Sequence, residues 1–218
     1  MKAHRSGFMF PDADQFMFKE LRDDGNYQRD HYDAARTFVS NWACAVDGGA
    51  HVGVWSRLMA TDFKTVYAFE PAPDTFEALT TNLSSFGCRN VETYQVALGH
   101  RRIKVGLTMD EKHVKLANTG ARHLSLDNSV ERTVRVETLD SFALPTLGFL
   151  KLDVEGSELF ALQGADETVM RCRPVILFED KNLWKRFKLT RDAPQGWLRQ
   201  HRYRPMLRVG CDEIWVPE

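Results

Sequence analysis

The residues best suited to bind a nucleotide-like ligand stand in a glycine-rich turn. The segment VDGGAHVG follows an apolar run and gives the pattern D-x-G-x-x-x-G at Asp47, Gly49 and Gly53. Glycines there let the backbone turn tightly and approach a ligand without a Cβ in the way. Glu70 follows the last of these glycines at close to the spacing of about 20 residues at which an acidic side chain binds ribose hydroxyls. Together these features predict an adenosine-binding site.

The same turn favours S-adenosylmethionine over a dinucleotide. Ala50 and His51 extend the loop beyond the G-x-G-x-x-G pattern, and Asp47 places a carboxylate at the turn. A carboxylate would repel a pyrophosphate but suits the cationic methionine half of the methyl donor. The expected cofactor residues of this turn are Asp47, Gly48, Gly49, Ala50 and Gly53.

A second group of charged residues marks the end of a later apolar run. In LKLDVEGSELFALQGA, Lys151, Asp153 and Glu155 occupy every second position, which predicts one shared face as the strand ends. Charged groups at a buried rim are costly without partners or a ligand. We therefore expect Asp153 to face the methyl-transfer region and Glu155 to serve as a site carboxylate held by the turn at Gly156. The alternative is an ion pair between Lys151 and Glu155 that only terminates the strand.

These residues require an α/β framework to position them. The 218 residues are 43% apolar, enough for one core, and apolar runs alternate with helical periodicity. The pattern predicts a Rossmann-like, doubly wound, mostly parallel sheet with an antiparallel C-terminal hairpin. The expected strands are 43–46, 66–69, 91–98, 147–154 and 174–178, the expected helices lie between Gly53 and Thr61 and at 74–86 and 157–165, and the hairpin pairs 205–209 with 213–216.

The first 42 residues are expected to form a helical cap on a single domain of residues 43–218. Amphipathic helices are predicted at 15–21 and 30–42. Ligands of doubly wound sheets bind at the carboxyl ends of the strands, so these helices could cover that edge as a lid. Ordinary packing helices are the alternative. Tyr27, in the turn between them, is expected in the acceptor pocket.

Composition and charge exclude several classes of protein. The four cysteines are widely spaced, which argues against a zinc or disulfide framework. The N-terminal apolar stretch is too short for a signal peptide or a membrane span, so we expect a cytoplasmic protein. Between Arg171 and Arg208, eleven basic residues stand against three acidic ones, although the net charge of the chain is −1. This basic third could face an anionic acceptor, or it could be a solvated surface.

Six blocks of the sequence resemble, in order and spacing, those of FkbM-type methyltransferases. They are VDGGAHVG, YAFEPAPDTFEALTTNL, NVETYQVALG, VETLDSF, FLKLDVEGSELFALQGADE and RPVILFE. The resemblance implies a class I fold, S-adenosylmethionine as cofactor and, commonly, O-methylation of a hydroxyl on a sugar or related natural product. It also implies that Glu70, with Pro71 beside it, binds the ribose and that Gln95 and Ala97 flank the adenine. His51 departs from the family pattern, where an Asn is expected.

Methyl transfer from a sulfonium mainly requires alignment of the acceptor and exclusion of water. The expected catalytic residues are Asp153, Glu155, Lys151 and His51, and all but Lys151 are candidates for the base. Glu179 is expected near the substrate. A Mg²⁺ ion could be held by Asp153, Glu179 and Asp180 at the ends of neighbouring strands.

Two other functions compete with methylation of a small-molecule or glycan acceptor. A nucleic-acid methyltransferase would use the basic C-terminal third, but the sequence holds no N-P-P-Y-like tetrapeptide and no P-C dipeptide. A non-catalytic cofactor-binding protein would not need the charged set at Lys151, Asp153 and Glu155. The sequence leaves the oligomeric state open.

Overall fold

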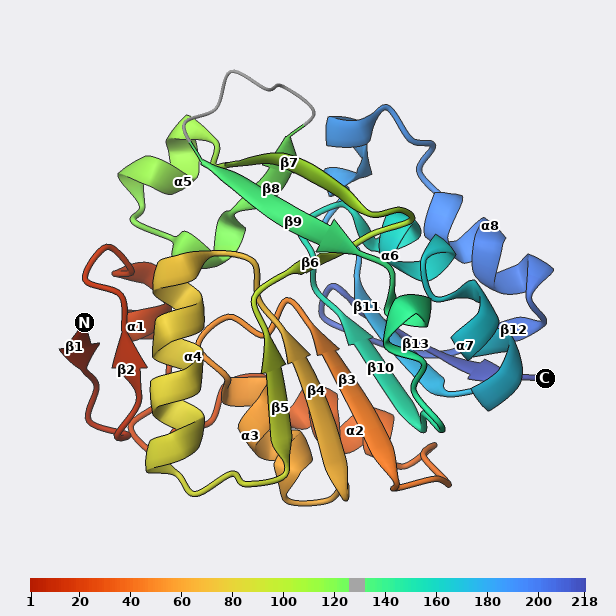
Figure 1. Cartoon of the computed structure of the whole chain (residues 1–218), viewed down its shortest axis with the longest axis horizontal. Helices are drawn as coiled ribbons and strands as arrows, with labels where there is room; N and C mark the ends of the chain where they lie inside the picture. The colour runs from red at the N-terminus through yellow and green to blue at the C-terminus, as the bar shows by residue number, and fades with distance from the viewer. Residues whose placement is uncertain (126–131) are drawn as a thin grey trace.

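The computed structural model of the chain describes residues 1–125 and 132–218. Its large sheet has seven strands in the order β12-β13-β11-β10-β3-β4-β5 (Figure 1). The five strands from β11 to β5 are parallel, β13 pairs antiparallel with β11, and β12 pairs antiparallel with β13. The expected Rossmann-like sheet with an antiparallel hairpin is therefore confirmed. The strands are β3 (Cys44–Gly48), β4 (Thr65–Phe69), β5 (Val91–Tyr94), β10 (Phe149–Leu152), β11 (Val175–Glu179), β12 (Tyr203–Val209) and β13 (Asp212–Pro217).

Helices cover both faces of this sheet. Tyr32 of α2 and Trp55 of α3 join one buried cluster with Ala45 and Phe149 from the strands. On the opposite face, α6, α7 and α8 pack against the side chains of β3, β10 and β11. Because helices cover both faces, β3, β10 and β11 are buried along their whole length, and their residues are apolar except for Gly48, Asp47, Lys151 and Glu179. The helices are α2 (Arg29–Arg36), α3 (Val54–Ala60), α4 (Pro73–Ser85), α6 (Glu158–Gln163), α7 (Asp166–Cys172) and α8 (Ala193–Gln200).

A small second sheet lies over the carboxyl ends of the parallel strands (Figure 1). The sequence predicts one strand over 91–98, and this is wrong, because the amide of Val96 donates to the carbonyl of Tyr94 and turns the chain. β5 ends at that turn and β6 joins the small sheet. This sheet therefore roofs the edge where ligands bind in such folds. Its elements are β6 (Ala97–Leu98), β7 (Ile103–Thr108), β8 (His123–Ser125) and β9 (Thr133–Glu137), with α5 (Glu111–Lys115) and the 3₁₀ turn η1 (Thr119–Ala121) between β7 and β8.

The N-terminal segment has two structural parts. A hairpin, β1 (Lys2–Ala3) and β2 (Met9–Phe10), leads into α1 (Phe16–Glu20) and packs beside α4 (Figure 1). Asn82 of α4 fixes it by exchanging hydrogen bonds of 2.6 and 2.9 Å with the backbone of Met9. The second expected helix, α2, ends at Arg36 and belongs to the core beneath the sheet. α2 reaches the carboxyl edge through His31, whose Nδ1 lies 2.7 Å from Asp212, the register partner of Glu179 at the end of β11.

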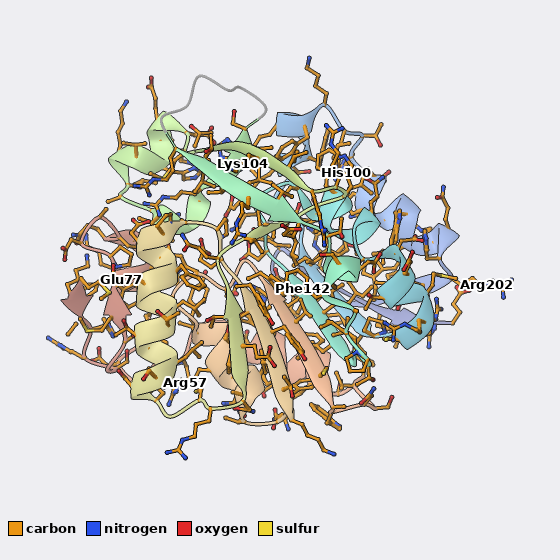
Figure 2. The ribbon with its side chains drawn as sticks, viewed as in Figure 1. Arg57, Glu77, His100, Lys104, Phe142 and Arg202 are labelled. Carbon is orange, nitrogen blue, oxygen red and sulfur yellow. The ribbon has the colours of Figure 1, made fainter. Side chains whose placement is uncertain are left out.

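Aromatic side chains close the sheet near its β5 edge. Tyr94 and Phe69 stack with ring centres 5.3 Å apart, and Phe142 from the turn η2 (Leu139–Phe142) meets both rings edge-on at 4.8 and 4.9 Å. Figure 2 shows Phe142 in front of the strands.

Within residues 1–125 and 132–218, every helix is too short or too polar to cross a lipid bilayer.

Gly49 lets β3 and β10 continue into their loops side by side. Its φ is +80°, and a Cβ there would lie 1.9 Å from the carbonyl oxygen of Asp153. Gly87, at the end of α4, has a similar φ of +69° but open space around the position of a Cβ. Comparing substitutions at the two glycines therefore separates the free-energy cost of the backbone conformation from that of the steric clash.

We expect Gly49→Ala to lower the free energy of unfolding by more than about 3 kcal/mol, because it combines backbone strain with a backbone clash. Gly87→Ala should cost only about 1–2 kcal/mol, the strain alone. Urea denaturation of both variants measures the difference. Equal losses would show that the turn and the end of β10 can move apart.

Candidate active site

A cavity opens at the carboxyl edge of the large sheet, beneath the small sheet. Its volume is about 1080 Å³ when the open mouth is included. Five parts of the chain line it: the N-terminal segment, the glycine-rich turn, the ends of β4 and β10, the small sheet with η1, and the loop after β11. The cavity thus brings together segments that are far apart in the sequence.

A buried ion pair lies at the base of this cavity. Lys151 Nζ is 2.9 Å from Asp47 Oδ1 and donates to the carbonyl of Gly49 at 3.0 Å, while Ser56 donates to the other oxygen of Asp47 at 2.7 Å. Asp47 is fully buried and Lys151 nearly so. Burial alone would lower the pKa of Lys151, but Asp47 and Asp153 outweigh it and raise the pKa. The alternative pairing of Lys151 with Glu155 is therefore wrong.

Glu70 directly follows β4 and lines the cavity. One carboxylate oxygen accepts the amide of His51 at 3.0 Å and the other accepts the amide of Ala72 at 2.9 Å. Burial raises the pKa of Glu70. Each oxygen retains a second lone pair, so the carboxylate can still accept two hydroxyl donors. The neighbouring lining from Phe69, Pro71 and Ala97 is largely apolar, which suits a flat ring system.

The structure divides the expected cofactor residues into two groups. Gly49, Ala50, Glu70, Pro71, Ala97 and Asp153 line the cavity. The remaining four, Asp47, Gly48, Gly53 and Gln95, do not. Gly48 is needed for packing, since a Cβ would lie 2.8 Å from Leu152, and Gly53 precedes α3 with a φ of +91°. The cofactor contacts of both groups stay predictions.

His51 is held by two residues that the sequence did not indicate. Its Nε2 lies 3.0 Å from Asp14 and 3.1 Å from Thr119, and Thr119 donates to Asp14 at 2.7 Å. Burial would raise the pKa of Asp14, but hydrogen bonds from His51, Thr119 and the Met17 amide lower it overall. This clasp of Asp14, His51 and Thr119 joins the N-terminal segment, the glycine-rich turn and η1. As a base, His51 would first have to leave it.

Three carboxylates converge at the other end of the cavity. Each of Asp153, Glu155 and Glu179 offers an oxygen, and these oxygens all lie within 4.8 Å of one another. Glu155 has a φ of +56°, so it lies in a turn beyond β10 and the expected strand alternation stops at Leu152. The predicted meeting of Asp153 and Glu155 nonetheless occurs, through the turn.

Two cations that the sequence analysis missed offset part of the charge of this carboxylate cluster. Lys181 Nζ lies 2.6 Å from Glu179 and 4.0 Å from Glu155. Arg186, in the turn η3 (Leu183–Phe187), lies 3.4 Å from the second oxygen of Glu155. Burial and the charge of Asp153 raise the pKa of Glu155 to about 7 and that of Glu179 still further. Both cations belong to the basic stretch after Glu179, and this stretch is the feature of the sequence that could have indicated them.

The expected Mg²⁺ ligands do not all meet. Asp180 lies outside the carboxylate cluster, with Arg208 at 3.9 Å, and Glu155 stands in the place expected for it. Lys181 already contacts two of the three carboxylates, so a Mg²⁺ ion bound there would have to displace its ammonium group or lie beside it. The arrangement fits an internal lysine better than a divalent metal.

Tyr27 also lines the cavity, as expected for an acceptor contact. Burial and the nearby Asp153 raise the pKa of Tyr27 to about 12. Its hydroxyl is therefore neutral at pH 7 and is available as a hydrogen-bond donor. Glu179 contributes to the site through Lys181, which does line the cavity.

Comparison with known proteins decides the family. The profile of the methyltransferase FkbM domain matches residues 47–205, most of the chain. The chain belongs to the FkbM methyltransferase family. It is 27% identical to Methyltransferase 1 of Beauveria bassiana over 56% of this chain and 58% of that one. It is 26% identical to the hexuronic acid methyltransferase AglP of Haloferax volcanii over 60% of this chain and 53% of that one.

A solved structure supports the same fold. The FkbM methyltransferase of Methylobacillus flagellatus superposes with a TM-score of 0.58 at 17% identity, over 80% of this chain and 43% of that one. This chain spans only a little more than half the length of the Beauveria bassiana and Haloferax volcanii relatives. The comparison confirms the class I methyltransferase fold, which implies S-adenosylmethionine as cofactor.

We expect Lys151→Met to lower the free energy of unfolding by about 3–5 kcal/mol, because it leaves the Asp47 carboxylate buried without a counter-charge. Lys115→Met is the control. Lys115 pairs with Glu111 at 3.9 Å on the surface, where both side chains are exposed, so its loss should change stability by less than about 0.5 kcal/mol. Thermal and urea unfolding of both variants measures the effect. Similar stabilities for the two would show that the buried pair does not hold the sheet.

Proposed function

We propose that this FkbM methyltransferase transfers a methyl group from S-adenosylmethionine to a hydroxyl of a sugar, a glycoconjugate or a small natural product. One observation carries the proposal. A single cavity has Glu70, a carboxylate suited to accept ribose hydroxyls, at one end, and the carboxylate cluster with Tyr27 at the other. A donor and an acceptor bound in this cavity would meet between the two ends. Alignment of this kind supplies much of the catalysis of a methyl transfer.

The cavity fits the cofactor that the family implies. Glu70 would accept the ribose hydroxyls, Phe69, Pro71 and Ala97 would contact the adenine, and Gly49 and Asp153 would border the methionine half. The bound cofactor supplies an already activated methyl group. The protein residues then have to orient the acceptor, exclude water and take up the hydroxyl proton.

The nature of the acceptor rests on two kinds of support. The relative AglP is named for methylation of a hexuronic acid, an acidic sugar. In this chain, Lys181 lines the cavity with its side chain 45% exposed, which offers a cation to an acidic acceptor. We therefore include uronic acids with neutral sugars in the proposed substrate class.

The basic C-terminal third gives little support to the nucleic-acid alternative. Arg173 donates to the carbonyls of His201 and Arg202, and Arg171 donates to those of Leu144 and Pro145. Arg186 pairs with Glu155. Much of this charge therefore stabilises the fold and the site.

The cap proposal narrows to the segment before α2. Phe16 and Met17 of this segment line the cavity, and the clasp of Asp14, His51 and Thr119 ties the segment to the cofactor turn. We propose that this segment closes the cofactor end of the cavity. Tyr32 and Ala35 of α2 pack in the core, so the proposal does not extend to that helix.

The function is tested with S-adenosylmethionine carrying a deuterated methyl group and an acceptor panel. The panel contains neutral hexosides, hexuronic acid glycosides, amino sugars, polyhydroxylated natural products and an RNA. We expect mass spectrometry to find the label on an oxygen of a glycoside or natural product. The reaction should persist after exhaustive treatment with EDTA, because Lys181 and Arg186 already pair with Glu179 and Glu155 of the carboxylate cluster. Label on an amine or on RNA, or no S-adenosylhomocysteine with any acceptor, would contradict the proposal.

Glu70→Ala should weaken binding of S-adenosylmethionine about tenfold or more, since two ribose hydroxyls lose their acceptor. Glu70→Gln, which keeps the volume and one acceptor oxygen, should fall between Glu70→Ala and the wild type. Glu77→Ala is the control, because Glu77 is exposed on α4 (Figure 2). Titration calorimetry gives the three affinities, and wild-type binding by Glu70→Ala would remove the ribose assignment.

A further inference from the structure

Gln28 is a polar residue of the cavity wall with no role in the site described so far. It follows Tyr27 in the turn before α2, is partly buried and lines the cavity. It also lies before residue 47, where the match to the FkbM profile begins. The family pattern therefore assigns no role to Gln28, and its role has to be argued from its surroundings.

The side-chain amide of Gln28 has a fixed orientation. Trp55 Nε1 donates to Gln28 Oε1 at 2.9 Å. An indole nitrogen can only donate, so the amide must present its oxygen to Trp55 and its Nε2 group elsewhere. Within residues 1–125 and 132–218, this Nε2 makes no hydrogen bond, and it is not among the buried atoms that lack a partner. Both side chains line the cavity, so the two N–H groups are available to a ligand bound there.

The backbone of Gln28 adopts a conformation that favours glycine. Its φ is +51° and its ψ is +33°, in the left-handed region, where a Cβ is unfavourable. The hydrogen bond from Trp55 and a bond of 3.2 Å from the Tyr32 amide to the Gln28 carbonyl hold the residue in place. A glycine would form the same turn with less strain. The turn by itself therefore does not explain a glutamine at this position.

Trp55 places the Gln28 amide beside the glycine-rich turn. It is the second residue of α3, which begins directly after that turn. Lys151 Nζ lies 5.7 Å from the centre of the same indole ring and donates to the carbonyl of Gly49 at 3.0 Å. The Gln28 amide and Gly49 therefore border the same part of the cavity, where the methionine half of the cofactor would bind.

A ligand carboxylate in this part of the cavity would depend on neutral donors. Among the described residues, the lysine and arginine side chains that line the cavity each pair with a carboxylate of the protein. These pairs are Lys151 with Asp47, Lys181 with Glu179 and Arg122 with Asp74. The Nε2 group of Gln28 has no such partner, and hydrogen bonds to a charged group are among the stronger ones in proteins.

Asp153 offers the complementary charge. Its carboxylate lines the cavity and forms no ion pair or side-chain hydrogen bond in the part of the chain that the structure describes. Burial and the charge of Asp153 raise the pKa of Tyr27, the residue before Gln28, so Asp153 lies near the turn that carries the amide. A zwitterionic amino-acid group needs this combination, a carboxylate for its ammonium group and N–H donors for its own carboxylate.

We propose that Gln28 binds the carboxylate of the methionine half of S-adenosylmethionine through its Nε2 group, while Asp153 binds the ammonium group. The inference rests on S-adenosylmethionine as the cofactor of the proposed function. With the ribose held at Glu70 and the amino-acid group held beside α2, the sulfonium between them is fixed from both sides. Such alignment supplies much of the catalysis of a methyl transfer.

The test compares two ligands that differ only in the carboxylate. They are S-adenosylhomocysteine and its decarboxylated analogue, in which a hydrogen replaces the carboxylate. Titration calorimetry on the full chain gives both affinities. Gln28→Ala should weaken binding of S-adenosylhomocysteine about tenfold or more, because the carboxylate loses its donor. Binding of the analogue should change less than about threefold, which also shows that the variant is folded.

Gln28→Glu provides a second variant that keeps the acceptor for Trp55. The introduced carboxylate can still accept the indole N–H but repels the carboxylate of the ligand. At about pH 8, where a glutamate is ionised, this variant should bind S-adenosylhomocysteine more weakly than Gln28→Ala does. The decarboxylated analogue, which keeps only the ammonium group, should bind as well as to the wild type or better. Gln200→Glu is the control, because Gln200 is exposed at the end of α8 and is not among the residues that line the cavity.

The two ligands separate recognition of the carboxylate from a structural role. Equal losses of affinity for both ligands, or wild-type affinity of Gln28→Ala for S-adenosylhomocysteine, would overturn the role of Gln28 and leave the proposed function intact. A wild-type chain that binds neither ligand would overturn the proposed function and this inference together. The measurement needs no methyl acceptor, so its result does not depend on which hydroxyl is methylated.

Discussion

The structure depends on one buried ion pair, between Asp47 on β3 and Lys151 on β10. The two residues are register partners on adjacent parallel strands, so their contact is set by the sheet itself. Two charges removed from water destabilise a fold unless each has further partners. Ser56 and the carbonyl of Gly49 provide them. Through Gly49 the lysine also holds the glycine-rich turn, so the same interaction supports the sheet and one wall of the cavity.

The remaining charges of the site follow from where parallel strands end. β3, β4, β10 and β11 all finish at one edge, so Glu70, Asp153 and Glu179 are brought to the same rim. Negative charges gathered in this way repel each other at low dielectric constant. Lys181 and Arg186, from the loop after β11, reduce that repulsion. The rim therefore includes its own cations, which offset part of its negative charge.

The sequence predicted the central sheet well because its strands are short apolar runs, and such runs indicate buried strands. It placed Glu70, Asp153 and Glu155 at one site, and all three line the cavity, because their spacing after β4 and β10 is local. It missed the strand order of the small sheet, the N-terminal hairpin and α7. The hairpin, for example, depends on a contact between Asn82 and Met9, which are 73 residues apart in the sequence. The partner of Lys151 was also out of reach. Neighbours along the chain suggested Glu155, whereas strand register selected Asp47.

The clasp of Asp14, His51 and Thr119 has a thermodynamic meaning for the whole N-terminal segment. The backbone of His51 donates to Glu70, while its ring binds the segment through Asp14. A ligand that engages Glu70 therefore acts on a loop that the segment also holds. Linkage makes such an effect reciprocal: the docked segment strengthens ligand binding by the same free energy by which the ligand strengthens docking. The N-terminal segment would then resist proteolysis more strongly when a ligand is bound at Glu70 than when the cavity is empty.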